Sequence, residues 1–313
     1  MAGWTEALSE ATVREDLLSW IDQRTFGGLE PIRSSVLNND FISGGVRYTL
    51  QSQQGIIRPR GFRAPLTITT VYRPPGRKTP YEDGEITGSG LFAYRYQGKD
   101  PNSYQNVALR QAFKDKIPLV WLRGIAKGEY MAVSPIWIAF DEPENLRVLF
   151  APRLDTPLGR FEESSGPDSL SPSERRYRSR QVMQRVHQPY FRQEVLKAYR
   201  DECAICSLRL RPLLDAAHVI PDAEEDGFLV VPNGVSLCKI HHAAFDSNII
   251  GIDPKYRVHV SQKILNEIDG PMLKHGIQEA DGRTLALPRS KAKQPDPDRL
   301  EVRWSRFIAA QAG

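Results

Sequence analysis

Hydrophobic positions along this chain of 313 residues recur with two different periods. Residues 5–24 show the spacing of an amphipathic helix, which the glycines of TFGGLEP end. From about residue 40 to residue 152 the pattern changes to short β-rich runs separated by Gly, Pro, Asn and Asp, with one helical stretch, NVALRQAFKDK, among them. These runs predict a compact β-barrel or a bent sheet with a packed helix.

The second half of the chain has a different organisation. Residues 156–180 are rich in Ser, Pro, Glu and Arg and poor in apolar residues, a composition typical of a flexible linker. The helical pattern QVMQRVHQPYFRQEVLKAYR opens a second unit, and a short helix, LEVRWSRFIAAQ, lies near the end. The pattern predicts an N-terminal helical segment at 1–30, a β-rich domain at 31–155, a linker at 156–180, a second domain at 181–262 and a C-terminal tail at 263–313.

Composition and charge narrow the class of protein. The chain is 40% hydrophobic and 26% charged, as soluble globular proteins are. It has no apolar run of about 18 residues and no signal-peptide pattern, so we expect a cytoplasmic protein without a membrane partner. The net charge of +4 is compatible with nucleic acid but says little alone. Basic residues concentrate at 175–200, either as a solvated helix face or as a phosphate-contacting surface.

All three cysteines fall in one pattern, Cys203-x-x-Cys206 followed by Cys238-x-x-His241. Two such pairs can converge on one tetrahedral zinc ion. An odd cysteine count argues against a disulfide framework. Buried cysteines acting as small apolar groups are the alternative. The spacing predicts a closed structural Zn²⁺ site.

The adjacent histidines of LCKIHHAAFD suggest a second site. If a helix starts near Cys238, then Cys238 and His241 lie on one face. His242 is rotated away and shares its face with Asp246, four residues later. An imidazole and a carboxylate suit a divalent cation that also binds water and phosphate oxygens. The two histidines are therefore predicted to serve two different sites.

Two further residues complete a pattern. His218 ends the apolar run LLDAAHVIP, and Asn233 lies in the turn VVPNGVSL. A single histidine in such a run is by default a core residue, but CAIC, DAAHVIP, PNGVSLC and HHAAFD together resemble the HNH (ββα-metal) nuclease family over roughly residues 200–255. The family's three letters correspond to His218, Asn233 and His242. In this family a β-hairpin and a helix hold the cation, and a cysteine zinc site braces many members.

The resemblance implies a mechanism. His218 would act as the general base on a water molecule. Mg²⁺ or Mn²⁺, bound by His242 and Asp246, would contact the scissile phosphate and stabilise the leaving oxygen. Asn233 would orient the hairpin or His218 through hydrogen bonds. Such enzymes leave a 5′-phosphate and a 3′-hydroxyl.

One position departs from the family pattern. Many members carry an Asp or His metal ligand immediately before the base, where this chain has Ala217. Either Asp215 substitutes as a ligand of the catalytic cation, or the site uses fewer protein ligands and more water.

The β-rich domain is dense in Arg, Tyr and Gly. The order PYEDG, FAYRYQG and NVALRQA resembles the SRA (YDG) domain, a PUA-like fold that binds modified cytosine by flipping it out of the duplex. Cations for phosphates and aromatic faces for an extruded base are what such a reader needs. The alternatives are a sheet core for the aromatic residues and an ordinary turn for Asp83-Gly84. Candidates are Arg58, Arg60, Arg63, Arg73, Arg77 and Lys78 for phosphates; Tyr81, Tyr94, Tyr96, Trp121 and Tyr130 for the base; and Asp83 or Glu129 for the cytosine amino group.

The combined prediction is an α+β protein with an N-terminal SRA-like (PUA-like) β-barrel with packed helices and a C-terminal zinc-braced ββα-metal HNH domain. These resemblances imply a modification-dependent, type IV-like restriction endonuclease that reads 5-methylcytosine or 5-hydroxymethylcytosine in double-stranded DNA and acts in phage defence. We expect a homodimer, because one HNH site cuts one strand. The alternatives are an HNH endonuclease that ignores modification, with the front domain a ligand sensor or general DNA binder, and a DNA-binding module without activity.

Overall fold

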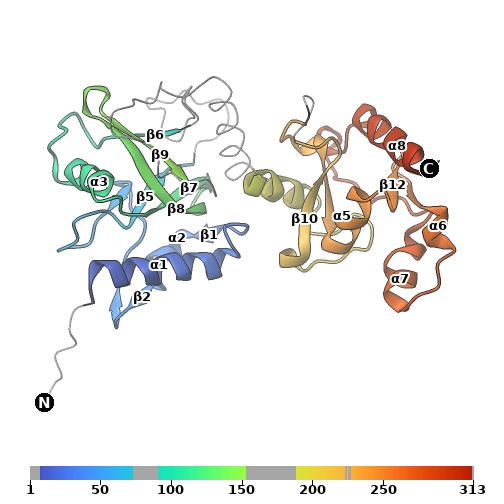
Figure 1. Ribbon diagram of the computed structural model, residues 1–313, viewed down its shortest axis with the longest axis horizontal. Coiled ribbons are helices and arrows are strands. Elements are labelled where there is room, and N and C mark those ends of the chain that lie inside the picture. The colour runs from blue at the N-terminus through green and yellow to red at the C-terminus, as the bar shows by residue number, and fades with distance from the viewer. Residues whose placement is uncertain (1–7, 73–90, 153–187, 223, 225–226, 312–313) are drawn as a thin grey trace, which may run out of the picture. The chain divides into compact units, whose positions relative to one another are not determined.

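The computed structural model describes residues 8–72, 91–152, 188–222, 224 and 227–311. The chain divides into two compact units, Met1–Pro189 and Tyr190–Gly313, each with its own core (Figure 1). The expected linker at 156–180 lies outside the described residues. No described helix is both long enough and apolar enough to cross a membrane.

The first unit is built on a seven-stranded sheet that curls into a half-barrel. All neighbouring strands are antiparallel except β5 and β7, which are parallel, so the chain crosses over between them through β6 and α3. The strand order is β4 (Ile56–Ile57), β5 (Thr67–Thr70), β7 (Leu119–Ala126), β8 (Glu129–Glu142), β9 (Arg147–Pro152) and β6 (Phe92–Arg95), with β1 (Ile32–Arg33) beside β8.

Hydrophobic clusters cover both faces of this sheet. Along β7, Val120 and Leu122 belong to a cluster with the first helix, whereas Trp121 between them belongs to a cluster with α3. This alternation is the two-residue period of a strand. The other elements are α1 (Glu10–Thr25), α2 (Ser34–Asn39), α3 (Tyr104–Lys114) and the small hairpin β2 (Ile42–Ser43) and β3 (Val46–Arg47).

The sequence explains where α1 begins. Ser9 caps the helix by accepting a hydrogen bond from the backbone N–H of Thr12 at 3.1 Å. Val13, Leu17 and Ile21 recur every four residues and are buried against the sheet. The periodicity therefore predicted the helix correctly, although it starts at Glu10.

The second unit is organised around the antiparallel hairpin of β10 (Leu214–His218) and β11 (Gly234–Cys238). Its register pairs Leu214 with Cys238 and His218 with Gly234. Residues 188–198 form a helix before the hairpin. After β11 come α5 (Lys239–Asp246), β12 (Ile250–Ile252), β13 (Val258–Val260), α6 (Gln262–Leu265), α7 (Pro271–Gly276) and α8 (Pro297–Gln311). Short 3₁₀ turns are η1 (Pro143–Asn145), η2 (Arg211–Leu213), η3 (Val231–Asn233), η4 (Gln278–Ala280) and η5 (Lys291–Lys293).

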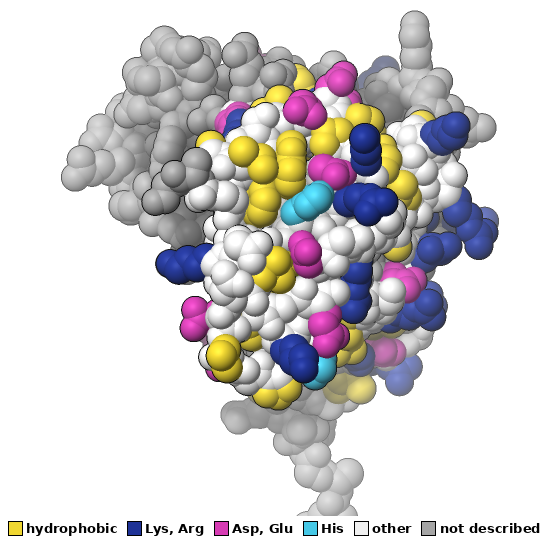
Figure 2. Space-filling model, turned by 90° about the vertical axis from the view of Figure 1, so that its right-hand side faces the viewer, with side chains coloured by type: hydrophobic (Ala, Val, Ile, Leu, Met, Phe, Trp, Pro, Cys, Tyr) yellow, Lys and Arg dark blue, Asp and Glu magenta, His cyan; other side chains and the backbone are white. Residues whose placement is uncertain are grey.

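The final helix is packed into this second unit. Leu300 and Phe307 of α8 are buried. Arg303 donates hydrogen bonds to Asn248 Oδ1 (2.6 Å) and to the Phe245 carbonyl, so α8 is tied to the C-terminal end of α5. The face that carries the C-terminal helices mixes acidic, basic and hydrophobic side chains, and neither sign of charge dominates it (Figure 2).

The chain is thus a mixed α+β protein, as its pattern predicted. The bent sheet of the first unit is present, while an SRA-like barrel stays a prediction.

Candidate functional site

The four predicted zinc ligands lie together in the second unit. Cys203 and Cys206 are in the segment before the hairpin, Cys238 ends β11, and His241 is in the first turn of α5. Their ligand atoms lie within 4.8 Å of one another. His241 Nδ1 is 3.1 Å from Cys238 Sγ and 3.5 Å from Cys203 Sγ, and Cys206 Sγ is 4.0 Å from Cys238 Sγ. Tetrahedral zinc with Zn–S bonds of about 2.3 Å needs spacings of about this size. The cluster could therefore hold a metal ion such as zinc.

The protonation of this cluster reflects the crowding of its donors. The neighbouring Cys206 and Cys238 thiols hydrogen bond to Cys203 and lower its pKa against the effect of burial. Burial disfavours the charged form of His241, but its contacts with Cys203 and Cys238 outweigh burial and raise the pKa of His241 to about 9. A cation among these atoms would replace shared protons, because thiolate and neutral imidazole are the forms that bind metal.

The opposite face of α5 carries a different set of groups. His242 is a half-buried ring whose Nε2 lies 3.3 Å from Asp246 Oδ2, one turn further along the helix. Its other nitrogen, Nδ1, lies 3.4 Å from Asp215 Oδ2 on β10. The two nitrogens of one imidazole diverge, so they cannot bind the same cation. Asp246 therefore lies at Nε2 of His242, and Asp215 lies at Nδ1 on the other side of the ring.

Asp215 is held by several cationic groups. Lys239 Nζ lies 3.1 Å from its Oδ2, and Arg192 Nε lies 3.7 Å from its Oδ1. The hydrogen bond with His242, followed by Lys239, outweighs burial and lowers the pKa of Asp215 to about 2. Ala217, the departure from the family pattern, is fully buried and offers no ligand atom.

Asn233 fixes the backbone directly after His218. Its buried side chain donates from Nδ2 to the carbonyls of Ile220 (2.9 Å) and Phe228 (3.1 Å), and its Oδ1 accepts from the N–H of Ile220 (2.8 Å). Both polar atoms of the Asn233 amide, Nδ2 and Oδ1, are therefore engaged with backbone groups of the protein. Asn233 thus holds the backbone after His218, and its role in positioning the base stays a prediction.

His218 ends β10 and stacks on Phe191, with ring centroids 4.5 Å apart and planes at 23°. Its Nε2 is buried and has no hydrogen-bond partner among the described residues. Burial is the main cause that lowers the pKa of His218, and the charge of His242 acts in the same direction, against Asp222 and Asp246. The ring therefore favours its neutral form.

A glycine allows the helix at 188–198 to approach this ring. A Cβ at Gly234, the strand partner of His218, would come within 2.7 Å of the Phe191 ring and 2.5 Å of Val195. Sequence reasoning missed the stacked Phe191 and the cations around Asp215. The four-residue spacing of Phe191 and Val195 indicated only a core-facing helix surface.

The residues predicted to read a base fall into three groups: outside the described residues, in the core of the first unit, and at its surface. Tyr81 and Asp83, like Arg73, Arg77 and Lys78, lie outside the described residues. Trp121 Nε1 donates to Thr70 Oγ1 at 2.8 Å, and the Tyr94 hydroxyl donates to the Gly55 carbonyl at 3.0 Å. Their burial is that of core residues, and a role in holding a base stays a prediction. Four of the predicted aromatic residues are buried in the first unit: Tyr94, Tyr96, Trp121 and Tyr130. Arg58 and Arg60, in contrast, line a surface cavity.

Two other predicted polar groups of the first unit are engaged in ion pairs. Arg63 lies 3.3 Å from Asp115, and Glu129 lies 3.8 Å from Arg33. Both pairs are at the surface.

Comparison with known proteins gave matches of different extent. Residues 203–253 match the family profile described as HNH endonuclease. The comparison with curated protein sequences gave no match. Among solved structures the chain is similar to "Modification dependent TagI restriction endonuclease", at 15% identity and a TM-score of 0.33, covering 88% of this chain and 90% of that one.

A second solved structure is the "Type IV phosphorothioation-dependent restriction endonuclease ScoMcrA", at 14% identity and a TM-score of 0.23. The match covers 79% of this chain and 50% of that one, so this chain spans about half its length. Neither score establishes a shared fold over the whole chain. The family match, in contrast, spans the cysteine pairs, the hairpin and α5. The chain therefore contains an HNH endonuclease domain at residues 203–253.

Proposed function

We propose that the chain is a metal-dependent DNA endonuclease whose HNH site hydrolyses phosphodiester bonds. The observation that carries this proposal is the arrangement within the matched domain. His218, whose burial favours the neutral imidazole, ends β10, and Asn233 hydrogen bonds to the backbone just after it. The face of α5 that is turned away from the cysteines presents His242 and Asp246. These groups supply a base and a cation site.

The donor set of His242 and Asp246 fits a divalent cation of the Mg²⁺ or Mn²⁺ class. When bound, such an ion supplies positive charge that stabilises the negative charge developing on the phosphate and the leaving oxygen. His242 Nε2 and the Asp246 carboxylate are the groups that would hold it. Asp215 accepts from the Nδ1–H of His242, which fixes the tautomer with a lone pair on Nε2. We therefore assign Asp215 a positioning role in place of the ligand role that the sequence suggested.

His218 removes a proton from a water molecule. Since its Nε2 is buried, Nδ1 is the nitrogen that we assign to the water. The water oxygen forms a bond to phosphorus, and the bond from phosphorus to the 3′ oxygen breaks. The 3′ oxygen takes a proton from solvent to become a 3′-hydroxyl beside a 5′-phosphate, and His218 returns its proton to solvent. Asn233 keeps the chain after the base in place during the step.

The Cys₃His cluster is proposed to hold a structural Zn²⁺. Its four donors include one exposed cysteine, Cys206, and three buried groups. These four donors would fill the coordination positions of a tetrahedral ion, so it would brace the hairpin against α5 and take no part in the reaction.

The test of the nuclease is the change of His218 to Ala. Cleavage of plasmid DNA with Mg²⁺ or Mn²⁺ should fall by a factor of about 10²–10⁴, the usual contribution of a general base. DNA binding, measured separately by anisotropy, should be unchanged. Lost cleavage with retained binding excludes a DNA-binding module without activity, whereas unchanged cleavage would mean that His218 is not the base.

The N-terminal unit is proposed to restrict cutting to DNA with 5-methylcytosine or 5-hydroxymethylcytosine, read by flipping the base. The Arg-, Tyr- and Gly-rich segment and its motif order support this part of the proposal. Matched plasmids with unmodified, methylated, hydroxymethylated and glucosylated cytosine test it. Equal cutting of all four would favour an endonuclease whose N-terminal unit is a ligand sensor or a general DNA binder.

We further propose that two copies act together, because one HNH site cuts one strand. Sedimentation on DNA should then show a dimer under conditions that give double-strand breaks. Double-strand cutting by a species that stays monomeric would contradict the dimer.

A further inference from the structure

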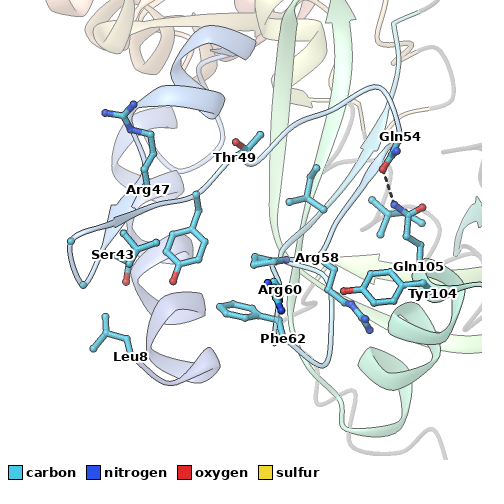
Figure 3. A pocket seen from close by; sticks show the side chains of 17 residues that line it. Leu8, Ser43, Arg47, Thr49, Gln54, Arg58, Arg60, Phe62, Tyr104 and Gln105 are labelled. Carbon is cyan, nitrogen blue, oxygen red and sulfur yellow. Dashed lines mark hydrogen bonds between the residues drawn. The ribbon is translucent and has the colours of Figure 1, made fainter. Parts of the chain in front are cut away.

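The first unit has a surface cavity that the HNH chemistry does not use. It has a volume of about 910 Å³ and lies between the β2–β3 hairpin, the segment at 54–62 and the start of α3 (Figure 3). This is near the upper end of the range of roughly 300–1,000 Å³ for sites that bind small molecules.

Three arginines, Arg47, Arg58 and Arg60, give the cavity a positive charge. None of its 17 lining residues is acidic, and none of the three forms an ion pair with a described carboxylate. Other arginines of this unit, such as Arg33 and Arg63, do have acidic partners. The cavity therefore keeps cationic charge available for an anion.

The cavity also has aromatic walls. The guanidinium of Arg58 lies over the ring of Tyr104, 3.3 Å from its centroid. Tyr104 is 58% exposed, so its ring can be reached from solvent. Phe62 (Figure 3) and Tyr48 also line the cavity, and their ring centroids lie 6.0 Å apart. Such flat surfaces are those on which nucleic-acid bases stack.

Polar atoms at one edge have no described partner. The Nε of Arg58 and the Oε1 of Gln105 are buried without a hydrogen bond. The Nε2 of Gln105 donates to Gln54 Oε1 at 3.1 Å, so the edge is ordered by an amide pair (Figure 3). Buried polar groups in native structures usually have partners. At this edge the described residues therefore satisfy the Arg58 guanidinium and the Gln105 amide only in part.

We propose that this cavity binds a nucleotide, with its base against the aromatic walls and its phosphate on the arginines. The nucleotide can come from a DNA strand or be free in solution. Phosphate contacts from arginine together with base stacking on aromatic rings are the means by which proteins hold single nucleotides of a strand. The proposal that DNA is the source rests on the proposed nuclease function. The site is made of surface residues and does not use the buried Tyr94 and Trp121.

The experiment measures binding by the chain of 313 residues without added Mg²⁺ or Mn²⁺, so that DNA is not cut. Fluorescein-labelled single-stranded and duplex DNA are titrated by anisotropy, and deoxycytidine 5′-monophosphate is titrated by calorimetry and as a competitor. Tyr104→Ala and Arg58→Ala should each weaken binding by about tenfold or more. Tyr104→Phe keeps the ring and should retain binding.

Two matched controls lie outside the cavity. Arg33 is an exposed arginine paired with Glu129, and Val107 is an exposed residue further along α3. Arg33→Ala and Val107→Ala should bind like the wild-type protein. Circular dichroism confirms that every variant is folded.

The outcomes separate the sources of the nucleotide. Displacement of DNA by the mononucleotide, lost in Arg58→Ala, shows that a free nucleotide suffices. Weaker DNA binding by the two cavity variants, with no binding of the mononucleotide to wild type, shows that the cavity takes a nucleotide only within a strand. Unchanged affinity of both cavity variants for DNA and for the mononucleotide overturns the proposal.

Cleavage assays distinguish this failure from failure of the nuclease. With Mg²⁺, Val107→Ala should cut like the wild-type protein, because its cavity and its HNH site are both intact. His218→Ala should bind but not cut. If His218→Ala cuts while Tyr104→Ala binds poorly, the catalytic assignment fails and the cavity assignment stands.

Discussion

Each histidine of the HNH region has a different environment, and that environment sets its chemistry. His241 faces sulfur atoms, which raise its pKa to about 9 despite burial. His242 lies between two carboxylates, one at each nitrogen. His218 is stacked on Phe191 and is kept neutral mainly by burial. Three identical side chains can therefore act as a zinc ligand, a cation ligand and a base.

The pH dependence of cleavage should report the pKa of His218. A general base is active when neutral, so the rate rises as pH increases through its pKa. Because burial lowers the pKa of His218, the acid limb should have its midpoint below the ordinary histidine value of about 6.5. Rates at saturating DNA across the acid range measure this midpoint.

A comparison variant tests the cause. Phe191→Leu removes the stacked ring and opens the site, so the midpoint should move up toward the ordinary value. A wild-type midpoint above about 6.5 would argue against a buried neutral base.

The assignment of Asp215 as a positioning residue can be tested by cation binding. Asp246→Ala removes a proposed ligand and should weaken Mn²⁺ binding, measured by titration calorimetry, more than Asp215→Asn does. Loss of a group that orients a metal-bound histidine typically costs about 10–100-fold in affinity or activity. Equal or greater loss in Asp215→Asn would instead make Asp215 a ligand.

Asn233→Ala should destabilise the second unit. It leaves the N–H and C=O of Ile220 and the C=O of Phe228 without their side-chain partner. An unsatisfied buried polar group costs about 1–3 kcal/mol, so a loss of about 3 kcal/mol in the free energy of unfolding is expected. Urea denaturation measures it, with the exposed Asn266→Ala as a control that should change little.

At the scale of elements, α5 separates two sites and the hairpin joins them. One face of α5 presents His241 to the cysteines, and the other presents His242 to Asp215 and Asp246. The hairpin supplies Cys238 at one end and His218 at the other end of the paired strands. The helix at 188–198 then covers His218. A shift of the hairpin or of α5 would therefore change both sites, and a shift of the helix at 188–198 would change the surroundings of His218.

Gly234→Ala tests this coupling. Its Cβ would meet Val195 and Phe191 at under 3 Å, so the helix at 188–198 must move away from His218. Overpacking of this kind typically costs about 1–3 kcal/mol, and cleavage should fall with it. Thermal melts and cleavage rates measure the two effects.

Gly270→Ala is the matched control, because its Cβ would meet no atom within 4 Å. If both glycine variants behave like the wild-type protein, packing of the helix at 188–198 against the hairpin is not what positions His218.

At the scale of the whole molecule, the two units have separate cores, and each carries one of the two proposed sites. The first unit carries the arginine-lined cavity, and the second carries the matched HNH domain. Since each unit buries its own hydrophobic clusters, we expect each to unfold as its own cooperative transition.

Removal of zinc should affect only one of these transitions. A structural zinc ion contributes directly to the stability of the domain that binds it. A zinc chelator should lower the melting temperature of the second unit, in scanning calorimetry, and leave that of the first unchanged. Gly234→Ala identifies the second unit's transition. A chelator that shifts neither transition would contradict the zinc assignment.

The sequence by itself determined the features that depend on local spacing. Two residues separate Cys203 from Cys206 and Cys238 from His241, and one helical turn separates His242 from Asp246, so short-range geometry brings the members of each pair together. The strand and helix periods likewise predicted α1 and the bent sheet, whereas the hairpin of the second unit was implied by the resemblance to the HNH family. Asn233 was found by its place in a motif; its hydrogen bond to Ile220 is seen in the structure, and a role in positioning His218 stays a prediction.

Only the tertiary structure decided what depends on contacts between distant segments. Asp215 lies beside Nδ1 of His242 because of the register of β10 and β11. Phe191 contacts His218 because Gly234 has no side chain. The aromatic content of the first unit suggests base binding, but it does not say which aromatic residues lie in the core and which at the surface. Packing against the sheet buried Trp121, while the start of α3 left Tyr104 exposed beside Arg58. Sequence spacing carries no information on such contacts, because they are set by how whole elements pack.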